Sequence, residues 1–259
     1  MTTAFNKYQG TGNDFIIIDN RNGLFNPDNS SLIQRLCDRR FGIGADGLIL
    51  INKKEACDFE MIYFNSDGHK GTMCGNGGRC AAAFAFKHKI AGRRQKFIAS
   101  DGIHEAEIEN DIVRLSMCDV KKISKKAGNY FIDTGSPHFV VFTTDAGNTD
   151  VSSEGRKIRW SDDFKPGGTN VNFVEILENG IYVRTFERGV EDETLSCGTG
   201  VTASAIASVL SGHFVSAPVN VRTRGGDLKV EFVAGPSLIT DIRLCGPATF
   251  VFEGTIDTE

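Results

Sequence analysis

The sequence predicts a strand-rich α/β fold made of two pseudo-symmetric halves, and three observations carry that prediction. Short apolar stretches typical of strands far outnumber helical stretches. The main landmarks of the chain recur in the same order, about half a chain length apart. Glycine makes up 29 of 259 residues, above the usual ~7%, which indicates many tight turns and close backbone approaches.

In the first half, short apolar runs bounded by Gly, Asn or Asp predict strands. They lie at residues 14–19, 47–51, 59–64, 96–100, 104–109 and 112–117. Helices are expected at Ser31–Arg40 and at 75–92, where the alanines favour a helix and Gly92 is suited to end it.

The second half repeats this inventory. Strands are expected at residues 130–133, 138–142, 170–177, 181–186, 219–224, 228–233 and 240–244. Helices are expected at Ser153–Trp160 and at 198–212, with Gly212 in the stopping role of Gly92.

Five landmarks pair up across the chain at offsets of 122–124 residues. They are Phe15 with Phe139, Gly44 with Gly168, Phe64 with Phe186, Cys74 with Cys197, and Gly102 with Gly226. We interpret this as duplication and fusion, with domains at 1–117 and 118–248, and with 249–259 returning to the first half as an edge strand. A pseudo-twofold chain of this kind favours an active site in the cleft between its halves.

Composition excludes several classes of function. The net charge of −4 offers no basic surface for nucleic acid or for anionic lipid. The longest apolar run, "AAAFAF", is far shorter than the ~20 residues of a membrane span, and no signal-peptide pattern opens the sequence. Seven cysteines, an odd number, fit a reducing cytoplasm. Scattered histidines and the lack of Cys-x-x-Cys predict no metal site, and we expect no cofactor.

Two cysteines stand out because each directly precedes a glycine-rich helix start. In "MCGNGGRC" and "SCGTGVTA", Cys74 and Cys197 lie where unpaired N–H groups and the positive helix dipole favour a thiolate and a bound carboxylate. Two such ends facing one substrate would place a base and an acid on opposite sides of one carbon. The pattern therefore indicates a cofactor-independent, two-base racemase or epimerase.

Other interpretations remain open at this point. A lone cysteine in a small-residue helix is usually a buried apolar residue, the role assigned to Cys37, Cys57, Cys80, Cys118 and Cys245. A redox pair or thiol sensor, or a binding module for an acidic ligand, would also suit cysteines at helix ends. The duplication of the motif favours the enzyme.

At these residues the sequence closely resembles the diaminopimelate epimerases. The likeness runs through "KYQGTGNDF", "RFGIGADG", "FNSDGHKGTMCGNGGRC", "GSPHF", "GGTNVNF" and "ERGVEDETLSCGTG". It implies two α/β halves, each a barrel-like sheet wrapped around a central helix. It also implies a homodimer that interconverts LL- and meso-diaminopimelate in lysine and cell-wall biosynthesis, without pyridoxal phosphate or metal.

The resemblance also assigns roles to individual residues. The acid/base thiols would be Cys74 and Cys197, with His138 and Glu187 tuning them. Groups that bind the substrate would be Asn13, Asn65, Gly75, Asn76, Ser136, Asn170, Glu187, Arg188, Gly198 and Thr199. Of these, Gly75, Asn76, Gly198 and Thr199 would hold the reacting carboxylate through backbone N–H groups.

Some of these residues have plainer interpretations. Asn65 before Asp-Gly is typical of a turn, His138 after a proline suits a satisfied loop residue, and Glu187–Arg188 suits a surface ion pair. Which thiol serves which isomer does not follow from the sequence.

The chain also departs from many relatives around the far end of the substrate. Ser136 replaces an asparagine, Gly47 a glutamine of some relatives, and the 188–197 segment is one residue longer. A racemase of another amino acid on the same scaffold therefore stays open. A proline or hydroxyproline racemase is disfavoured by Asn76 and by "ETLSC".

Overall fold

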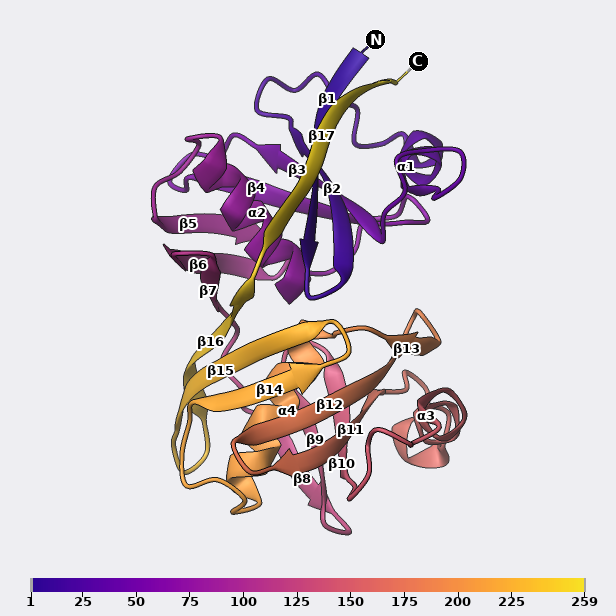
Figure 1. Cartoon of the computed structure of the whole chain (residues 1–259), viewed down its shortest axis with the longest axis vertical. Helices are drawn as coiled ribbons and strands as arrows, with labels where there is room; N and C mark the ends of the chain where they lie inside the picture. Colours follow the sequence, from indigo (N-terminus) through magenta and orange to yellow (C-terminus); the bar gives the residue numbers. More distant parts are fainter. Residues whose placement is uncertain (1, 259) are drawn as a thin grey trace. The chain divides into compact units, whose positions relative to one another are not determined.

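A computed structural model describes residues 2–258 of the chain. The chain forms two compact units, Met1–Leu115 with Gly246–Glu259, and Ser116–Cys245. Strands dominate both units, and the helices are few, as expected from the sequence (Figure 1).

The first unit is an eight-stranded sheet in the spatial order β17–β1–β2–β3–β4–β5–β6–β7. The strands are β1 (Thr2–Gly10), β2 (Asn13–Asp19), β3 (Gly47–Asn52), β4 (Phe59–Asn65), β5 (Arg94–Ala99), β6 (Gly102–Glu109), β7 (Ile112–Ser116) and β17 (Thr249–Asp257). Neighbouring strands are antiparallel except for β2–β3 and β4–β5, which are parallel.

Each parallel pair needs a crossover, and a helix supplies it. Helix α1 (Ser30–Cys37) connects β2 to β3, and α2 (Gly75–Lys87) connects β4 to β5. Helix α2 is buried along most of its length and contacts β1, β2, β3, β4, β6 and β17. It is therefore the central helix around which the sheet of this unit curls (Figure 1).

The second unit repeats this plan in the order β8–β9–β10–β11–β12–β14–β15–β16, with the short β13 on β12. The strands are β8 (Ile123–Lys126), β9 (Asn129–Asp133), β10 (Pro137–Phe142), β11 (Asn170–Leu177), β12 (Gly180–Glu187), β13 (Asp192–Thr194), β14 (Val219–Thr223), β15 (Gly226–Ala234) and β16 (Ile239–Pro247). Its parallel pairs, β10–β11 and β12–β14, correspond to β2–β3 and β4–β5.

Helices again fill the crossovers of the second unit. Helix α3 (Val151–Arg159) and the 3-10 turn η1 (Asp162–Phe164) connect β10 to β11, and α4 (Gly198–Leu210) connects β12 and β13 to β14. Helix α4 contacts β9, β10, β11, β12, β14 and β15, and its Val201 and Ile206 lie in the core. The strand senses and crossovers of the two units match throughout, which confirms the predicted fold of two repeated halves.

One edge strand of each sheet directly follows, along the chain, the last strand of the other sheet. Strand β17, which follows β16, pairs antiparallel with β1 of the first unit. Strand β8, which follows β7, pairs antiparallel with β9 of the second unit. Strand β8 therefore occupies the same edge position in the second sheet that the tail strand β17 occupies in the first.

The repeated glycines mark repeated turns. Gly102 and Gly226 open β6 and β15 with φ of +133° and +139°, a left-handed region that side chains rarely adopt. Gly44 and Gly168, with φ of +79° and +66°, precede β3 and β11 in the same way. The offset of 124 residues therefore records a shared backbone geometry.

The structure differs from the sequence prediction at several boundaries. Helix α1 ends at Cys37, three residues before the expected Arg40, because Asp38 adopts an extended conformation and its side chain accepts from the backbone N–H groups of Arg40 and Phe41. Helix α3 begins earlier than expected, at Val151, with the Asp150 carboxylate accepting from Ser153 N. Strands β1, β8 and β13 were not predicted.

Candidate active site

Both candidate thiols are the N-cap residues of the two central helices. Cys74 precedes α2 with φ −109° and ψ 119°, and Cys197 precedes α4 with φ −117° and ψ 112°. The carbonyl of Cys74 accepts from Gly78 N, and that of Cys197 accepts from Val201 N, each at 2.8 Å. The helix starts predicted from the two motifs are confirmed, and the two backbones are nearly superimposable in their torsions.

Neither cysteine side chain caps the helix that it precedes. Glycines at Gly75, Gly77, Gly198 and Gly200 keep side-chain bulk away from the first turn of each helix. An N-terminus of this form is suited to bind an anion such as a carboxylate, and its dipole favours a thiolate at the N-cap.

In the first unit, Cys74 lies against two of the predicted asparagines. Its Sγ is 3.6 Å from Asn13 Oδ1, and Asn76 Nδ2 donates to the same oxygen at 3.4 Å. Asn13 is the first residue of β2, and Asn76 lies in the first turn of α2. The structure therefore brings Cys74, Asn13 and Asn76 together.

An ionic cluster at the start of β2 orients Asn13. Asn13 Nδ2 donates to Asp46 Oδ2 at 2.6 Å, so its carbonyl oxygen is the atom that faces Cys74. Arg39 donates to Asp46 and to both oxygens of Asp14, which also pairs with the buried Lys7 at 2.8 Å. Burial raises the pKa of Asp14, but the hydrogen bonds and positive charges of Arg39 and Lys7 together lower it by more. The net shift of the pKa is therefore downward.

A buried arginine, Arg79, forms hydrogen bonds with residues of the first turn of α2. The side chain of Arg79 is fully buried, and it donates to Asn76 Oδ1 at 3.1 Å and to the carbonyl of Gly75 at 3.4 Å. It also donates to Thr11 Oγ1 at 3.3 Å. Because a guanidinium only donates, these contacts fix the amide of Asn76 with its NH2 group toward Asn13.

In the second unit, Cys197 lies against a hydroxyl instead. Its Sγ is 3.5 Å from Thr199 Oγ1, and that oxygen is 2.9 Å from His138 Nε2. Cys197 is 8% exposed, and His138, on β10, is fully buried. The structure therefore brings Cys197, Thr199 and His138 together.

The other ring nitrogen of His138 faces a buried amide. Asn172 Nδ2, on the neighbouring β11, is 3.1 Å from His138 Nδ1. Burial lowers the pKa of His138 to about 3, the hydrogen bond with Asn172 opposes that shift, and the charge of Arg188 adds to it. His138 is therefore neutral at physiological pH.

Three further predicted residues meet where β10 and β11 begin. Asn170 Nδ2 donates to Ser136 Oγ at 2.9 Å, and Asn170 Oδ1 accepts from the backbone N–H of Arg188 at 2.8 Å. The Arg188 side chain is exposed, and Glu187 Oε2 accepts from Thr194 Oγ1 at 2.9 Å.

Asn65 forms the turn that its sequence context suggests. It ends β4, its carbonyl accepts from Gly68 N at 3.0 Å, and its own N–H donates to the carbonyl of His69 at 2.9 Å. The asparagine is exposed, and its side-chain oxygen lies beside Gly71. A substrate contact of Asn65 stays a prediction.

Several residues of these clusters were missed in the sequence. They are Asn172 and Thr185 behind His138, and Arg79 and Thr11 behind Asn76. The signal available for Asn172 was a polar residue two positions after Asn170 in a strand, on the same face of β11. Their partners come from other strands, which spacing along the chain does not reveal.

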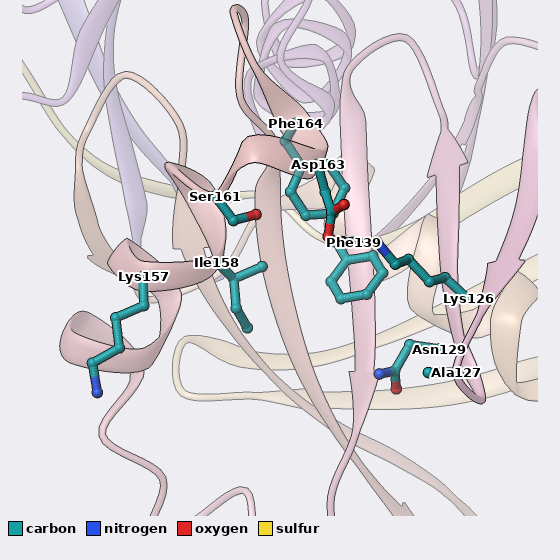
Figure 2. Close-up of a pocket in the computed structure, with 9 residues that line it drawn as sticks. All are labelled: Lys126, Ala127, Asn129, Phe139, Lys157, Ile158, Ser161, Asp163 and Phe164. Atoms are coloured by element: carbon teal, nitrogen blue, oxygen red, sulfur yellow. Dashed lines mark ion pairs between the residues drawn. The ribbon is translucent and has the colours of Figure 1, made fainter.

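One cavity of the second unit contains none of the predicted site residues. About 310 Å³ in volume, it lies between the β8–β9 hairpin, β10, α3 and η1 (Figure 2). Phe139 and Phe164 line it, with ring centroids 5.1 Å apart, beside the Lys126–Asp163 ion pair. Phe139 follows His138 on a strand, so the two side chains lie on opposite faces of β10.

Residues 2–258 hold no group of three or more His, Cys, Asp or Glu side chains arranged to bind a metal ion. No helix among them has the length and apolar character needed to cross a bilayer.

Solved structures share this fold at low sequence identity. A phenazine biosynthesis protein of the PhzF family from Bacillus anthracis superposes with a TM-score of 0.78 and 15% identity, covering 99% of each chain. A hydroxyproline epimerase from Agrobacterium vitis gives 0.73 and 13%, covering 98% of this chain and 92% of its own. At these identities the likeness shows the fold alone.

Sequence comparison is more specific. The family model for diaminopimelate epimerase matches residues 5–123 and 130–249. Proteins named diaminopimelate epimerase are 54% identical over 96% of this chain in Flavobacterium psychrophilum and 46% over 95% in Chlorobaculum tepidum, each covered over 98% of its length. The chain therefore belongs to the diaminopimelate epimerase family.

Proposed function

We propose that the chain interconverts LL- and meso-diaminopimelate by a two-base mechanism in which Cys74 and Cys197 are the acid and the base. An isomerase activity follows from its family. The finer statement, that these two thiols perform the chemistry, is supported mainly by one observation. Both cysteines are N-caps of central helices, with matching torsions and with glycines in the first turn.

The chemistry balances with two thiols and no cofactor. A thiolate takes the α-hydrogen as a proton, and the electron pair of the C–H bond moves toward the substrate carboxylate. The opposite thiol then gives its proton to the other face of that carbon, which inverts the centre. Helix N-termini that hold the carboxylate stabilise the charge that develops on it.

Substrate recognition is assigned to the residues around the two helix starts. Backbone N–H groups of Gly75, Asn76, Gly198 and Thr199 would hold the reacting carboxylate. Asn170 already holds the backbone of Arg188, whose exposed guanidinium suits a second carboxylate. Glu187 would take an ammonium group, in keeping with a substrate that is zwitterionic at both ends.

Isotope exchange tests this proposal directly. Reduced enzyme incubated with LL-diaminopimelate in deuterated water should yield the meso isomer with one deuterium at the inverted α-carbon. Cys74→Ala and Cys197→Ala should each abolish inversion, while Cys57→Ala, a half-buried thiol outside both clusters, should leave it unchanged. Normal turnover in either active-site variant would refute the two-base scheme.

The same assay separates the remaining alternatives. A panel of other amino acids would reveal a racemase of different specificity as exchange with one of them and none with diaminopimelate. A redox or sensor protein would show no exchange with any of them. We also expect a cytoplasmic homodimer, from the cysteine content and the family resemblance, and light scattering on the purified protein would give its mass.

A further inference from the structure

We propose that hydrogen bonds of opposite direction keep the two thiols in opposite protonation states before substrate binds. Thr199 donates to a thiolate at Cys197, whereas a neutral thiol at Cys74 donates to Asn13. This inference rests on the proposed function and assigns the resting roles: Cys197 is the base and Cys74 the acid. It also adds Asn172 and Asp46 to the mechanism as positioning residues.

The direction of the bonds at Cys197 is set by a backbone carbonyl. Asn172 Nδ2 lies 3.4 Å from the carbonyl of Phe139, which can only accept, while Asn172 Oδ1 lies 2.9 Å from Thr185 Oγ1. The amide group that faces His138 Nδ1 at 3.1 Å is therefore NH2, a donor.

The tautomer of His138 follows from that contact. Nδ1 accepts from Asn172, and a neutral ring then carries its proton on Nε2. Nε2–H donates to Thr199 Oγ1 at 2.9 Å, which leaves the hydroxyl hydrogen of Thr199 for another acceptor. Cys197 Sγ, at 3.5 Å, is in position to accept it. A donor aimed at sulfur favours the thiolate.

The bonds at Cys74 run the other way. Asp46 accepts from Asn13 Nδ2 at 2.6 Å, so Asn13 presents its carbonyl oxygen to Cys74 Sγ at 3.6 Å. A hydrogen-bond acceptor that faces the sulfur favours the neutral thiol, because only the S–H form can donate to it.

The side chains packed beside Gly200 in α4 differ from those beside the matching Gly77 in α2. A Cβ added at Gly200 would meet Asn172 Oδ1 and the His138 ring, whereas one at the matching Gly77 would meet methyl groups of Ile49 and Met61. The two halves therefore share a backbone but differ in the side chains that face the first turn of each central helix.

This arrangement makes one form of the enzyme ready for one isomer. The Cys197 thiolate takes the α-proton and becomes a thiol, while Cys74 gives up its proton and becomes a thiolate. Returning to the resting form moves one proton from Cys197 to Cys74 through exchange with solvent. The isomer whose α-hydrogen faces Cys197 meets the resting form directly.

Other charged groups belong to the surroundings of the two thiols. Glu187 ends β12 and Arg188 follows it, and the charge of Arg188 acts on His138 beside Cys197. Arg79 donates to Asn76, and Asp46 accepts from Asn13, beside Cys74. The test must therefore isolate the hydroxyl contribution while leaving these charges in place.

Alkylation with iodoacetamide, followed by mass spectrometry of the two cysteine peptides, measures each thiolate separately. The pH midpoint of the rate reports the ionisation of each thiol, whereas the rate itself also depends on how easily the reagent reaches it. In the wild-type chain Cys197 should have the lower midpoint. Thr199→Val should raise the Cys197 midpoint by about one pH unit, roughly the effect of one hydrogen bond to a charged group.

Matched variants keep the test specific. Thr199→Ser keeps the hydroxyl and should restore the wild-type Cys197 midpoint, which a merely structural role of Thr199 would not predict. Asn172→Leu should raise the Cys197 midpoint in the same direction as Thr199→Val. Thr11→Val, which removes a hydroxyl beside α2, should leave the Cys197 midpoint in place.

Two results would overturn the inference: equal midpoints for the two thiols in the wild-type chain, or an unchanged Cys197 midpoint in folded Thr199→Val. Inversion activity is scored separately. Equal midpoints in an enzyme that inverts diaminopimelate would remove the assigned resting states and leave the proposed function standing. Loss of deuterium exchange in the wild-type chain would remove the proposed function itself.

Discussion

Adding one methyl group at each of two matched glycines should have very different consequences. Gly77 and Gly200 occupy the same position in the first turn of α2 and α4, 123 residues apart. The perturbation is Gly→Ala at each site in turn. An alanine fits the helical backbone at either position, so the surroundings of the new Cβ decide the outcome.

At Gly200 the new Cβ would lie 2.3 Å from Asn172 Oδ1 and 3.3 Å from two atoms of the His138 ring. Asn172 would have to move by roughly 1 Å to reach ordinary contact distance, and its bonds to Thr185 and His138 hold it in place. Overpacking costs about 1–3 kcal/mol, and a broken buried hydrogen bond about 1–3 kcal/mol. Helix propensity returns at most about 1 kcal/mol, so we expect a net loss of about 2 kcal/mol.

At Gly77 the nearest atoms are Ile49 Cδ1 at 3.2 Å and Met61 Cε at 3.3 Å. Both are ends of flexible apolar side chains, which can yield by a few tenths of an ångström. The small strain and the gain in helix propensity nearly cancel, so Gly77→Ala should change stability by less than about 0.5 kcal/mol.

Thermal unfolding followed by circular dichroism measures the contrast. A loss of about 2 kcal/mol lowers Tm by roughly 4–8 °C in chains of this size, which should be seen for Gly200→Ala and not for Gly77→Ala. Gly200→Ala should also slow inversion, because the displaced Asn172 no longer orients His138. Equal Tm shifts in the two variants would refute the reasoning about the packing behind each helix.

Two further perturbations probe the surroundings of the site. Asp14→Asn should destabilise the chain by about 3–5 kcal/mol near neutral pH, because it leaves the buried Lys7 without its carboxylate. The pKa of Asp14 is lowered on folding, so its contribution is present above the unfolded value of ~3.9 and is lost as pH falls below it. The free energy of unfolding, measured with urea, should therefore fall more steeply below pH 4 in the wild-type chain than in the variant. The same pH dependence in both chains would count against the ion pair. Glu191→Ala frees the turn that carries Arg188, since Glu191 accepts from Gly189 N, Arg159 and Trp160 at 3.0–3.2 Å. We expect KM to rise about 3–10-fold with little change in kcat. The control variant Glu154→Ala, on the surface of α3, should leave KM unchanged. An unaltered KM in Glu191→Ala would show that this turn does not contribute to substrate binding.

Periodicity and spacing predicted the helix starts because the signals are local. Alanine-rich stretches after Cys74 and Cys197 form α2 and α4; α4 ends at Leu210, close to the expected Gly212, but α2 ends at Lys87, well before the expected Gly92. Strand β1 was missed for a tertiary reason. Its buried residues include Asn6 and Lys7, polar side chains that are satisfied by His88 and Asp14 from elsewhere in the fold. Phe5 and Tyr8 are buried beside them, so polar and apolar side chains are mixed at the buried positions and the usual alternating pattern does not appear.

The candidate site likewise contains residues that a local sequence pattern identifies and residues that only the tertiary structure brings together. Cys74 and Cys197 could be selected from sequence because their helix-end setting is local. The Asn172–His138–Thr199 chain could not, because it depends on the register of β10 against β11, which pairs His138 with Asn170 and Phe139 with Val171. The sense of each hydrogen bond depends further on amides that only neighbouring carbonyls orient.

A duplicated scaffold creates a difficulty for a two-base enzyme. Two halves with identical surroundings would give their thiols the same affinity for a proton, so the form with one thiol and one thiolate would have no preferred arrangement. The chain keeps the backbone at both cysteines and changes what stands behind it: Asn172 and His138 beside Gly200, against Ile49 and Met61 beside Gly77. On the protonation states proposed above, this divergence supplies the preference. Removing the amide that orients His138, with Asn172→Ile, should therefore alter which isomer is processed faster without altering the helices that carry the thiols.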